Sequence, residues 1–157
     1  PLFLPVFDKV SDNRKKYRRK VNKADLIILE GWCVGSKPID PNYLKKNINE
    51  LEKIEDSNLL WRTAYNKALV EYQKVFKKFS YFVFIKIPNW KFVIDWKYKQ
   101  ELGLRSSNSN NHLKKKLYRF IQFYEKLSKW MYLTSPSDCN VLITLDKKQT
   151  VKKITYK

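Results

Sequence analysis

The amino-acid sequence predicts an α/β fold in which a mostly parallel sheet carries helices on both faces. Short apolar runs alternate along the chain with longer amphipathic stretches. Leu26–Leu29 and Phe82–Ile85 have the continuous apolar pattern of strands covered on both faces, as in a parallel sheet between layers of helices. Strands that alternate with helices indicate α/β architecture with right-handed crossovers.

Four apolar runs are predicted to be strands, and a weaker pattern favours a fifth. The four runs are 2–7, 26–29, 81–87 and 141–145. In the charged tail after residue 147, Val151, Ile154 and Tyr156 show the weak alternation of an edge strand.

Helices are predicted between these strands. Apolar residues at spacings of one, three and four trace one face of a long helix over 61–79 and of another over 113–131. Shorter amphipathic stretches cover about 43–54 and 91–102, and Asn89 is placed to cap the second of them.

Length and composition limit the class of protein. The chain has 157 residues, for which one domain is the natural expectation. With 43% hydrophobic residues it is too apolar for a disordered polycation, and no apolar run approaches the roughly 20 residues of a membrane span. Cys33 and Cys139 fit neither a disulfide framework nor a zinc site, so we expect a protein of the reducing cytoplasm. Because no run is long enough to span a membrane, we expect no membrane partner.

The net charge of +18 has two interpretations. It results from 33 basic and 15 acidic residues, and such a balance suggests an anionic partner such as nucleic acid. However, only six of the basic residues are arginine, the residue that specific nucleic-acid readers favour. We therefore favour compositional bias with a solvated lysine surface, and keep nucleic-acid binding as the alternative.

Acidic residues follow three of the four predicted strands, at the edge where open parallel sheets bind ligands. Asp8 follows the first run, Glu30 the second and Asp146 the fourth. This placement indicates either a cation or proton-transfer site, or ordinary turns and helix caps, in which Asp and Glu are common. The spacing alone leaves both interpretations open.

Glu30 and Asp8 carry the most specific chemical hypotheses. An apolar strand that ends in Glu30 and Gly31 resembles the second nucleotide-site strand of phosphate-transferring ATPases, where the carboxylate orients Mg²⁺ or its water. Asp8 is placed to accept or hold a substrate hydroxyl proton, and Arg14 to pair with a substrate carboxylate. A solvated strand-end turn at Glu30 and a local surface pair of Asp8 with Arg14 are the alternatives.

A cationic segment precedes the polar stretch 105–112, which predicts a loop. Lys97, Lys99, Gln100 and Arg105 lie on or just after the fourth helical stretch. Cations on such a segment suit a closing lid that neutralises a transferring phosphate, and a solvated helix face is the alternative.

The glycine count excludes a phosphate loop within these 157 residues. The chain has only Gly31, Gly35 and Gly103, and the motif Gly-x-x-x-x-Gly-Lys-Ser/Thr is absent.

Motifs along nearly the whole chain resemble those of D-glycerate 3-kinase-like P-loop kinases, in the same order. The most specific is Glu-Gly-Trp-Cys-Val-Gly at 30–35, within the matching run Asp25 to Pro38. The others are Pro5-x-Phe7-Asp8-Lys9 with Asp12 and Arg14; Asn49, Leu51, Glu52, Glu55, Asp56, Trp61, Arg62, Asn66 and Tyr72; Trp96, Lys97, Gln100 and Glu101; and 120–130. Three departures are Val10-Ser11, which disturbs the serine spacing after Phe-Asp-Lys, Asn13 in place of an acid, and Lys97 in place of an arginine.

The resemblance implies an ATP-dependent kinase that phosphorylates a hydroxyl of D-glycerate or a similar metabolite, with ATP and Mg²⁺ as cofactors. The wider group includes uridine kinases, phosphoribulokinases and pantothenate kinases. It implies catalytic roles for Asp8 and Glu30, with Glu30 also near magnesium. Substrate binding is implied for Lys9, Arg14 and Trp32, and phosphate or lid roles for Lys97, Gln100 and Arg105.

The resemblance also implies that 1–157 is a single partial kinase domain, with substrate, Walker B-like and lid regions. Its P-loop NTPase-type sheet is expected to lack the first strand and the phosphate loop. The chain is therefore expected to be inactive alone, with an N-terminal half as a possible partner. A nucleic-acid-binding module and a non-catalytic, kinase-derived scaffold are the alternative functions.

Overall fold

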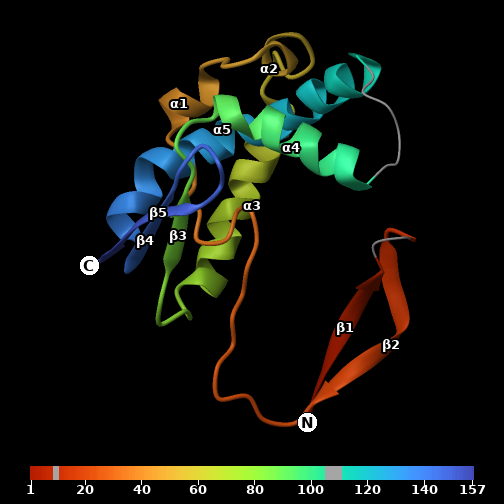
Figure 1. Cartoon of the computed structure of the whole chain (residues 1–157), viewed down its shortest axis with the longest axis vertical. Coiled ribbons are helices and arrows are strands. Elements are labelled where there is room, and N and C mark those ends of the chain that lie inside the picture. Colours follow the sequence, from red (N-terminus) through yellow and green to blue (C-terminus); the bar gives the residue numbers. More distant parts are fainter. Residues whose placement is uncertain (9–10, 105–110) are drawn as a thin grey trace. The chain divides into compact units, whose positions relative to one another are not determined.

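The structure, a computed structural model, describes residues 1–8, 11–104 and 111–157, with the backbone alone at 103, 104, 111 and 112. The chain divides into two compact units, Pro1–Trp32 and Cys33–Lys157. The first unit is coloured red to orange in Figure 1, and the second unit continues to blue at the C-terminus. Each unit is described separately.

The first unit contains an antiparallel two-stranded ribbon of β1 (Leu2–Asp8) and β2 (Asn13–Val21). The strand predicted at 2–7 is confirmed, whereas β2 was not predicted. Six of the nine residues of β2 are basic, so it lacks the alternating apolar pattern that identifies a half-buried strand. Both strands are largely exposed, and only Val6, Asp8 and Val21 are half-buried.

The strand predicted at 26–29 is not formed. Leu26, Ile27 and Ile28 lie in an extended segment without ladder hydrogen bonds, and they are 76%, 76% and 78% exposed. The physical reason is that a strand exists only with a hydrogen-bonded neighbour, and the two paired strands of this unit pair with each other.

The second unit places helices before, between and around a three-stranded sheet. The helices are α1 (Pro41–Lys45), α2 (Glu50–Ile54), α3 (Leu60–Phe76), α4 (Lys91–Leu104) and α5 (Asn111–Asp138). The strands are β3 (Val83–Lys86), β4 (Val141–Leu145) and β5 (Val151–Tyr156). Both long predicted helices, the strand at 141–145 and the edge strand in the tail are confirmed. The stretch 43–54 is instead two short helices, because Lys46 turns to extended backbone and Asn49 caps α2.

The sheet has the order β3-β4-β5. β3 runs parallel to β4, from Val83 opposite Val141 to Lys86 opposite Thr144, and α4 and α5 form the crossover between them. β5 pairs with β4 in the antiparallel direction. The described sheet thus has one parallel and one antiparallel pair, so the prediction of a mostly parallel sheet is not met. The antiparallel pair arises because the short Asp146–Thr150 turn returns the chain directly to β4.

Two hydrophobic clusters hold the second unit together. Ile39, Leu44, Leu69 and Leu127 join α1, α3 and α5, with Tyr43, Tyr65 and Trp130 around them. Phe84, Met131 and Cys139 join β3 to the end of α5. The prediction that Phe82–Ile85 is covered on both faces is wrong for this structure, because Val83 is 46% and Ile85 56% exposed. No helix among the described residues is both long and apolar enough to cross a membrane.

Candidate functional site

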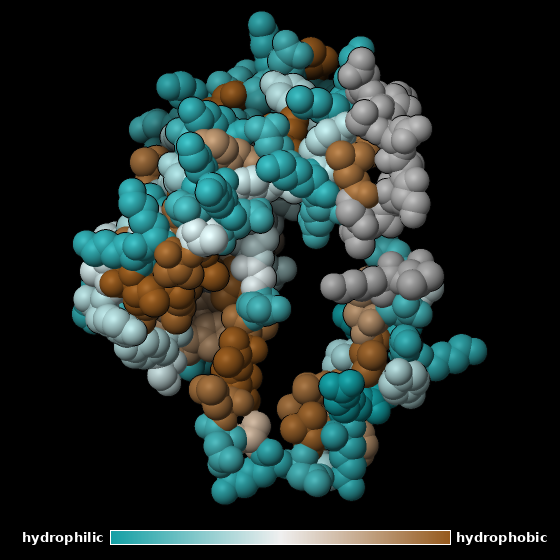
Figure 2. All heavy atoms as spheres, viewed as in Figure 1, coloured by the Kyte–Doolittle hydropathy of each residue, from teal (hydrophilic) through white to brown (hydrophobic). Residues whose placement is uncertain are grey.

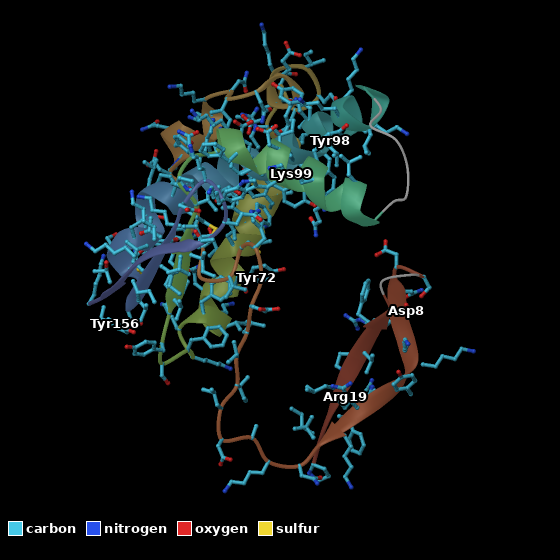
Figure 3. The ribbon with its side chains drawn as sticks, viewed as in Figure 1. Asp8, Arg19, Tyr72, Tyr98, Lys99 and Tyr156 are labelled. Atoms are coloured by element: carbon cyan, nitrogen blue, oxygen red, sulfur yellow. The ribbon has the colours of Figure 1, made fainter. Side chains whose placement is uncertain are left out.

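The ribbon of the first unit brings two predicted site residues to one end. Asp8 is the last residue of β1 and lies opposite Asn13, while Arg14 lies opposite Phe7, so Asp8 and Arg14 flank the same turn. Figure 3 shows Asp8 at this end of the ribbon. The Asn13 side chain accepts the Arg14 backbone N–H at 2.7 Å, and the Arg14 side chain is exposed. Lys9 lies outside the described residues.

Glu30 and Trp32 follow the ribbon in the extended segment that ends the first unit. Glu30 is exposed, and Trp32 is 46% exposed. In the described part of the chain no three or more His, Cys, Asp or Glu residues form a group that could hold a metal ion. A single carboxylate is compatible with Mg²⁺, because that ion keeps several waters and uses one or two carboxylates together with substrate phosphates.

Lys97 and Gln100, two of the predicted lid residues, lie on α4 and are already engaged with neighbours. The Lys97 ammonium lies 3.1 Å from a Glu101 carboxylate oxygen and 3.1 Å from the Gln100 amide oxygen. The indole N–H of Trp96 donates to the Lys147 carbonyl at 3.2 Å, which ties α4 to the turn after β4. Of the loop predicted at 105–112, Arg105 and the other residues up to 110 lie outside the described residues, whereas Asn111 and His112 belong to α5, so the prediction is wrong for these two.

Asp146 closes the turn between β4 and β5. Its carboxylate accepts the backbone N–H groups of Lys148 at 2.7 Å and Thr150 at 3.0 Å. The hydrogen bonds from Thr150, followed by that from Lys148, hold the pKa of the Asp146 carboxyl below its usual range. Of the two interpretations left open for the strand-end acids, the turn is therefore the one that applies at Asp146.

A groove that the sequence did not reveal lies where β3 ends. It has a volume of about 520 Å³, and its lining includes Tyr43, Lys86, Trp90, Lys129 and Tyr132. The carboxyl end of a strand in a parallel pair is the edge at which open α/β sheets bind ligands. Lys86 escaped notice because it lies inside the apolar run predicted as a strand. A cation at the end of such a run was the available signal.

Contacts within the groove fix its walls. The Tyr132 hydroxyl donates to the Ile87 carbonyl, which holds the chain leaving β3, and burial raises the Tyr132 pKa to about 12. The Lys86 ammonium lies 5.6 Å from the centre of the Tyr132 ring, and Lys129 pairs with Glu125 at 2.7 Å. The groove therefore combines two lysines with aromatic walls, and Glu125 neutralises one of the two.

A buried ionic network joins α2, α3 and α5. It is formed by Glu52, Asp56 and Arg62 from the motif residues at 49–62, together with Lys126. The Arg62 side chain is fully buried, and its Nε lies 2.7 Å from an Asp56 oxygen while Nη1 lies 3.3 Å from Glu52 Oε2. The Lys126 ammonium lies 3.2 Å from the same Glu52 oxygen. Two cations thus balance two carboxylates, as burial of charge requires.

Burial and the partners within the network both shift the pKa values of Lys126 and Asp56. Burial lowers the pKa of Lys126 against the attraction of Glu52. Burial alone would raise the pKa of Asp56, but hydrogen bonds from the Arg62 side chain and from the backbone N–H groups of Trp61 and Arg62 hold it below its usual range. Sequence reasoning identified these residues only through the resemblance, because charged side chains are expected at the surface.

The segment after the Glu-Gly-Trp-Cys-Val-Gly string is fixed against α3. The Asn66 side chain accepts the backbone N–H of Ile39 at 2.6 Å and donates to the Ile39 carbonyl at 3.1 Å. The Gln73 side-chain amide donates to the Ser36 carbonyl at 2.8 Å. Gly35 has φ +78°, and a Cβ there would lie 2.6 Å from the Phe82 ring. Glycine is therefore required at 35 both by backbone conformation and by space.

Comparison with known proteins identifies the fold. The D-glycerate 3-kinase of Cryptococcus neoformans var. grubii serotype A superposes with a TM-score of 0.69 at 18% identity, over 99% of this chain and 60% of that enzyme. The chain has the fold of D-glycerate 3-kinase. The YGR205w protein superposes with a TM-score of 0.66 at 16% identity, over 98% of this chain and 57% of that protein.

A comparison of sequences gives one further similar protein. Mug58 of Schizosaccharomyces pombe, described as an uncharacterized kinase, is 29% identical over 100 residues, which are 62% of this chain and 35% of mug58. No family model matches the chain. The resemblance to D-glycerate 3-kinase-like kinases predicted from the motifs is confirmed, and the chain spans only part of the length of each of these proteins.

Proposed function

We propose that this chain is part of an ATP-dependent kinase that phosphorylates a hydroxyl group of D-glycerate or a similar hydroxy acid. The observation that carries the proposal is the fold of D-glycerate 3-kinase over 99% of the chain. Sequence similarity to the mug58 kinase over 100 residues supports it independently. Both units are proposed to belong to one kinase domain.

The acceptor substrate is proposed to bind at the turn end of the ribbon. Asp8 holds or deprotonates the hydroxyl that receives the phosphoryl group, and the Arg14 guanidinium pairs with the substrate carboxylate. The register of the ribbon, which places both residues beside one turn, supports this pairing of roles. Lys9 and Trp32 complete the proposed substrate contacts.

The phosphate-binding roles are assigned to Glu30 and to α4. Glu30 would hold Mg²⁺ through its carboxylate, and the ion would supply charge neutralisation of the ATP phosphates. Lys97, Gln100 and Arg105 would contact the phosphates from the lid. For this, the Lys97 ammonium must exchange Glu101, its partner at 3.1 Å, for a phosphate oxygen.

The 157 residues alone are proposed to be inactive, because they contain no phosphate-loop motif. The test is an assay of ATP-dependent phosphorylation of D-glycerate by the product of the whole gene. Asp8→Asn and Glu30→Gln should each lower kcat by at least about 100-fold, while Glu71→Gln, on an exposed α3 carboxylate paired with Lys74, should leave it unchanged.

Three results would each contradict a different part of the proposal. If the gene product binds ATP but phosphorylates no hydroxy acid, the substrate assignment is wrong. If Asp8→Asn retains full activity, the acceptor site lies elsewhere. If the 157-residue chain alone phosphorylates D-glycerate at the rate of the whole product, the proposed inactivity is wrong.

Binding of nucleic acid is a second candidate function, favoured by β2. None of its six cations forms an ion pair with a described carboxylate, and the major groove of DNA admits a two-stranded ribbon. Affinity for duplex DNA should then fall with salt, with a log–log slope of about 0.9 per phosphate neutralised. Reversal of Arg18 and Arg19 to glutamate should reduce that slope, and an unchanged slope would exclude the ribbon as the binding element.

A further inference from the structure

Helix α4 carries proposed phosphate contacts but contributes little to the core. Among its described side chains, 91–102, none is buried, whereas α3 buries Arg62 and Leu69. Neither hydrophobic cluster of the second unit includes a described residue of α4. In Figure 2 hydrophilic residues prevail over the part of the molecule where Figure 1 places α4. A helix without buried apolar contacts depends for its position on a few specific interactions.

The most specific of these interactions is made by Trp96. Its indole N–H donates to the Lys147 backbone carbonyl at 3.2 Å. The Phe92 ring, one turn earlier on α4, stacks with the Trp96 ring, with centroids 6.1 Å apart and an angle of 19° between the planes. This stacking restricts the indole to few orientations, and the observed one directs the N–H at Lys147. The contact of Tyr98 with α5 is weaker, because the Lys114 ammonium lies 6.0 Å from the ring centre, at the limit of cation–π distances.

The acceptor of this hydrogen bond belongs to a turn that is closed by hydrogen bonds of its own. Lys147 lies between β4 and β5, where the Asp146 backbone N–H donates to the Thr150 carbonyl at 2.9 Å. The Asp146 carboxylate also accepts the backbone N–H groups of Lys148 and Thr150. The Lys147 carbonyl is therefore held in place relative to the sheet, and the hydrogen bond from Trp96 fixes α4 to that sheet.

Trp96 lies beside both proposed phosphate contacts of α4. Lys97 follows it directly, and Gln100 lies four residues later, about one turn along the helix. A rotation or shift of α4 at Trp96 would therefore move both side chains together. Groups that stabilise a transferring phosphate act only from the correct position, so the position of α4 matters for their effect.

We propose that Trp96 is a positioning residue for the lid, whose hydrogen bond to the Lys147 carbonyl holds α4 where Lys97 and Gln100 contact the ATP phosphates. The hydrogen bond lies at the surface, where water competes for both partners, so α4 can leave this position and return to it. The inference rests on the proposed function in taking Lys97 and Gln100 as phosphate contacts. Trp96 itself belongs to the matched motif at 96–101, but the resemblance implies no role for it.

The test uses Trp96→Phe in the product of the whole gene, because phenylalanine keeps a ring beside Phe92 and removes the N–H. The amides of α4 should exchange with solvent about fivefold faster, while those of β4 and β5 stay unchanged. The dissociation constant of ATP with Mg²⁺, measured by calorimetry, should rise about fivefold, because α4 is correctly placed for a smaller fraction of the time. KM for D-glycerate should stay the same.

Two control variants separate the hydrogen bond from other effects. Tyr98→Phe changes the next aromatic residue of α4 and leaves the Trp96 N–H in place. Lys147→Ala removes a cation but keeps the backbone carbonyl that accepts the hydrogen bond. Both variants should retain the amide exchange rates of α4.

The outcomes distinguish this inference from the proposed function. If Trp96→Phe leaves the exchange of α4 unchanged, or accelerates it without weakening ATP binding, Trp96 does not position the lid. If Lys147→Ala accelerates the exchange as much as Trp96→Phe, the inference is also wrong, because the carbonyl is then not what holds α4. If the unsubstituted product binds ATP but phosphorylates no hydroxy acid, the substrate assignment is wrong, and amide exchange with ATP affinity still decides the role of Trp96. A product that binds no ATP contradicts both.

Discussion

Two apolar runs of the same length and character have different fates in this protein. Leu26–Leu29 and Phe82–Ile85 are both continuous, and both are predicted to be strands covered on two faces. The second contributes to β3, whereas the first is extended, unpaired and more than three-quarters exposed at Leu26, Ile27 and Ile28. A continuous apolar run therefore indicates only that burial would stabilise the segment. A β-strand forms there only where the chain supplies a second strand to pair with it.

The neighbour of the second run is supplied by its own crossover. α4 and α5 return the chain to β4, which pairs with β3 from Val83 to Lys86. Phe84 then packs against Met131 of α5. The first run lies between the ribbon and the second unit in sequence, and no described strand pairs with it.

The largest expected effect comes from breaking the buried ionic network around Arg62 in the second unit. Arg62→Ala leaves Glu52 and Asp56 buried without their guanidinium partner, at 3.3 Å and 2.7 Å in the native protein. We expect the second unit to lose about 3–5 kcal/mol of stability. Urea unfolding followed by tryptophan fluorescence measures this loss, and amide exchange of β3 should then approach that of 26–29.

The matched control for Arg62 is Arg119, an exposed arginine on α5. Arg119 Nη2 lies 2.8 Å from a Glu55 oxygen, and both side chains are about half exposed. Arg119→Ala should cost less than about 1 kcal/mol. Equal losses for the two variants would mean that the buried network does not anchor the unit.

The second prediction compares the two runs directly. Phe84 is 9% exposed and Ile28 is 78% exposed. Phe84→Ala should therefore destabilise the protein by about 3 kcal/mol through the cavity it leaves, and Ile28→Ala should change stability by no more than about 0.5 kcal/mol. Chemical denaturation of both variants decides the matter. A large loss for Ile28→Ala would show that the first run is buried in solution.

The elements that the sequence predicted well are those with a periodic pattern and nearby partners. β4 matches 141–145 because an apolar run there is bounded by Asn140 and Asp146, and α3 and α5 follow their apolar spacings. β2 escaped prediction because an exposed strand of cations has no period in hydrophobicity. The hydrophobic pattern of a segment does not show whether another strand is available to pair with it. The strand predicted at 26–29 is therefore wrong.

The candidate site was predictable to a smaller extent. The proximity of Asp8 and Arg14 follows from the ribbon register, which depends on the unpredicted β2. Arg62 and Glu52 are fully buried although charge ordinarily indicates the surface, so their structural role emerges only from their mutual contacts. The roles of Glu30, Lys97 and Gln100 in phosphate transfer stay predictions.

A smaller effect is expected where the chain leaves β3. The Asn89 carboxamide oxygen accepts the Lys91 backbone N–H at 2.9 Å at the start of α4, as the sequence predicted. Asn89→Ala should cost about 1 kcal/mol, whereas Asn89→Asp should retain the cap. Thermal unfolding of the two variants measures the difference, and equal losses would show that the hydrogen bond contributes nothing.

The smallest expected effect concerns Asp146, where the partner strand β4 ends. Because hydrogen bonds from Thr150 and Lys148 lower its pKa in the folded protein, the carboxylate contributes stability that is present above the unfolded value of about 3.9 and is lost as pH falls through the folded value. NMR titration should place the Asp146 pKa below 3.9, and Thr150→Val, which removes the hydroxyl donor, should raise it part of the way back. Asp146→Asn should flatten the acid limb of the stability curve. An unshifted pKa would mean that the turn does not hold β5 against β4 through this carboxylate, and the interpretation of Asp146 as a ligand-binding acid would be open again.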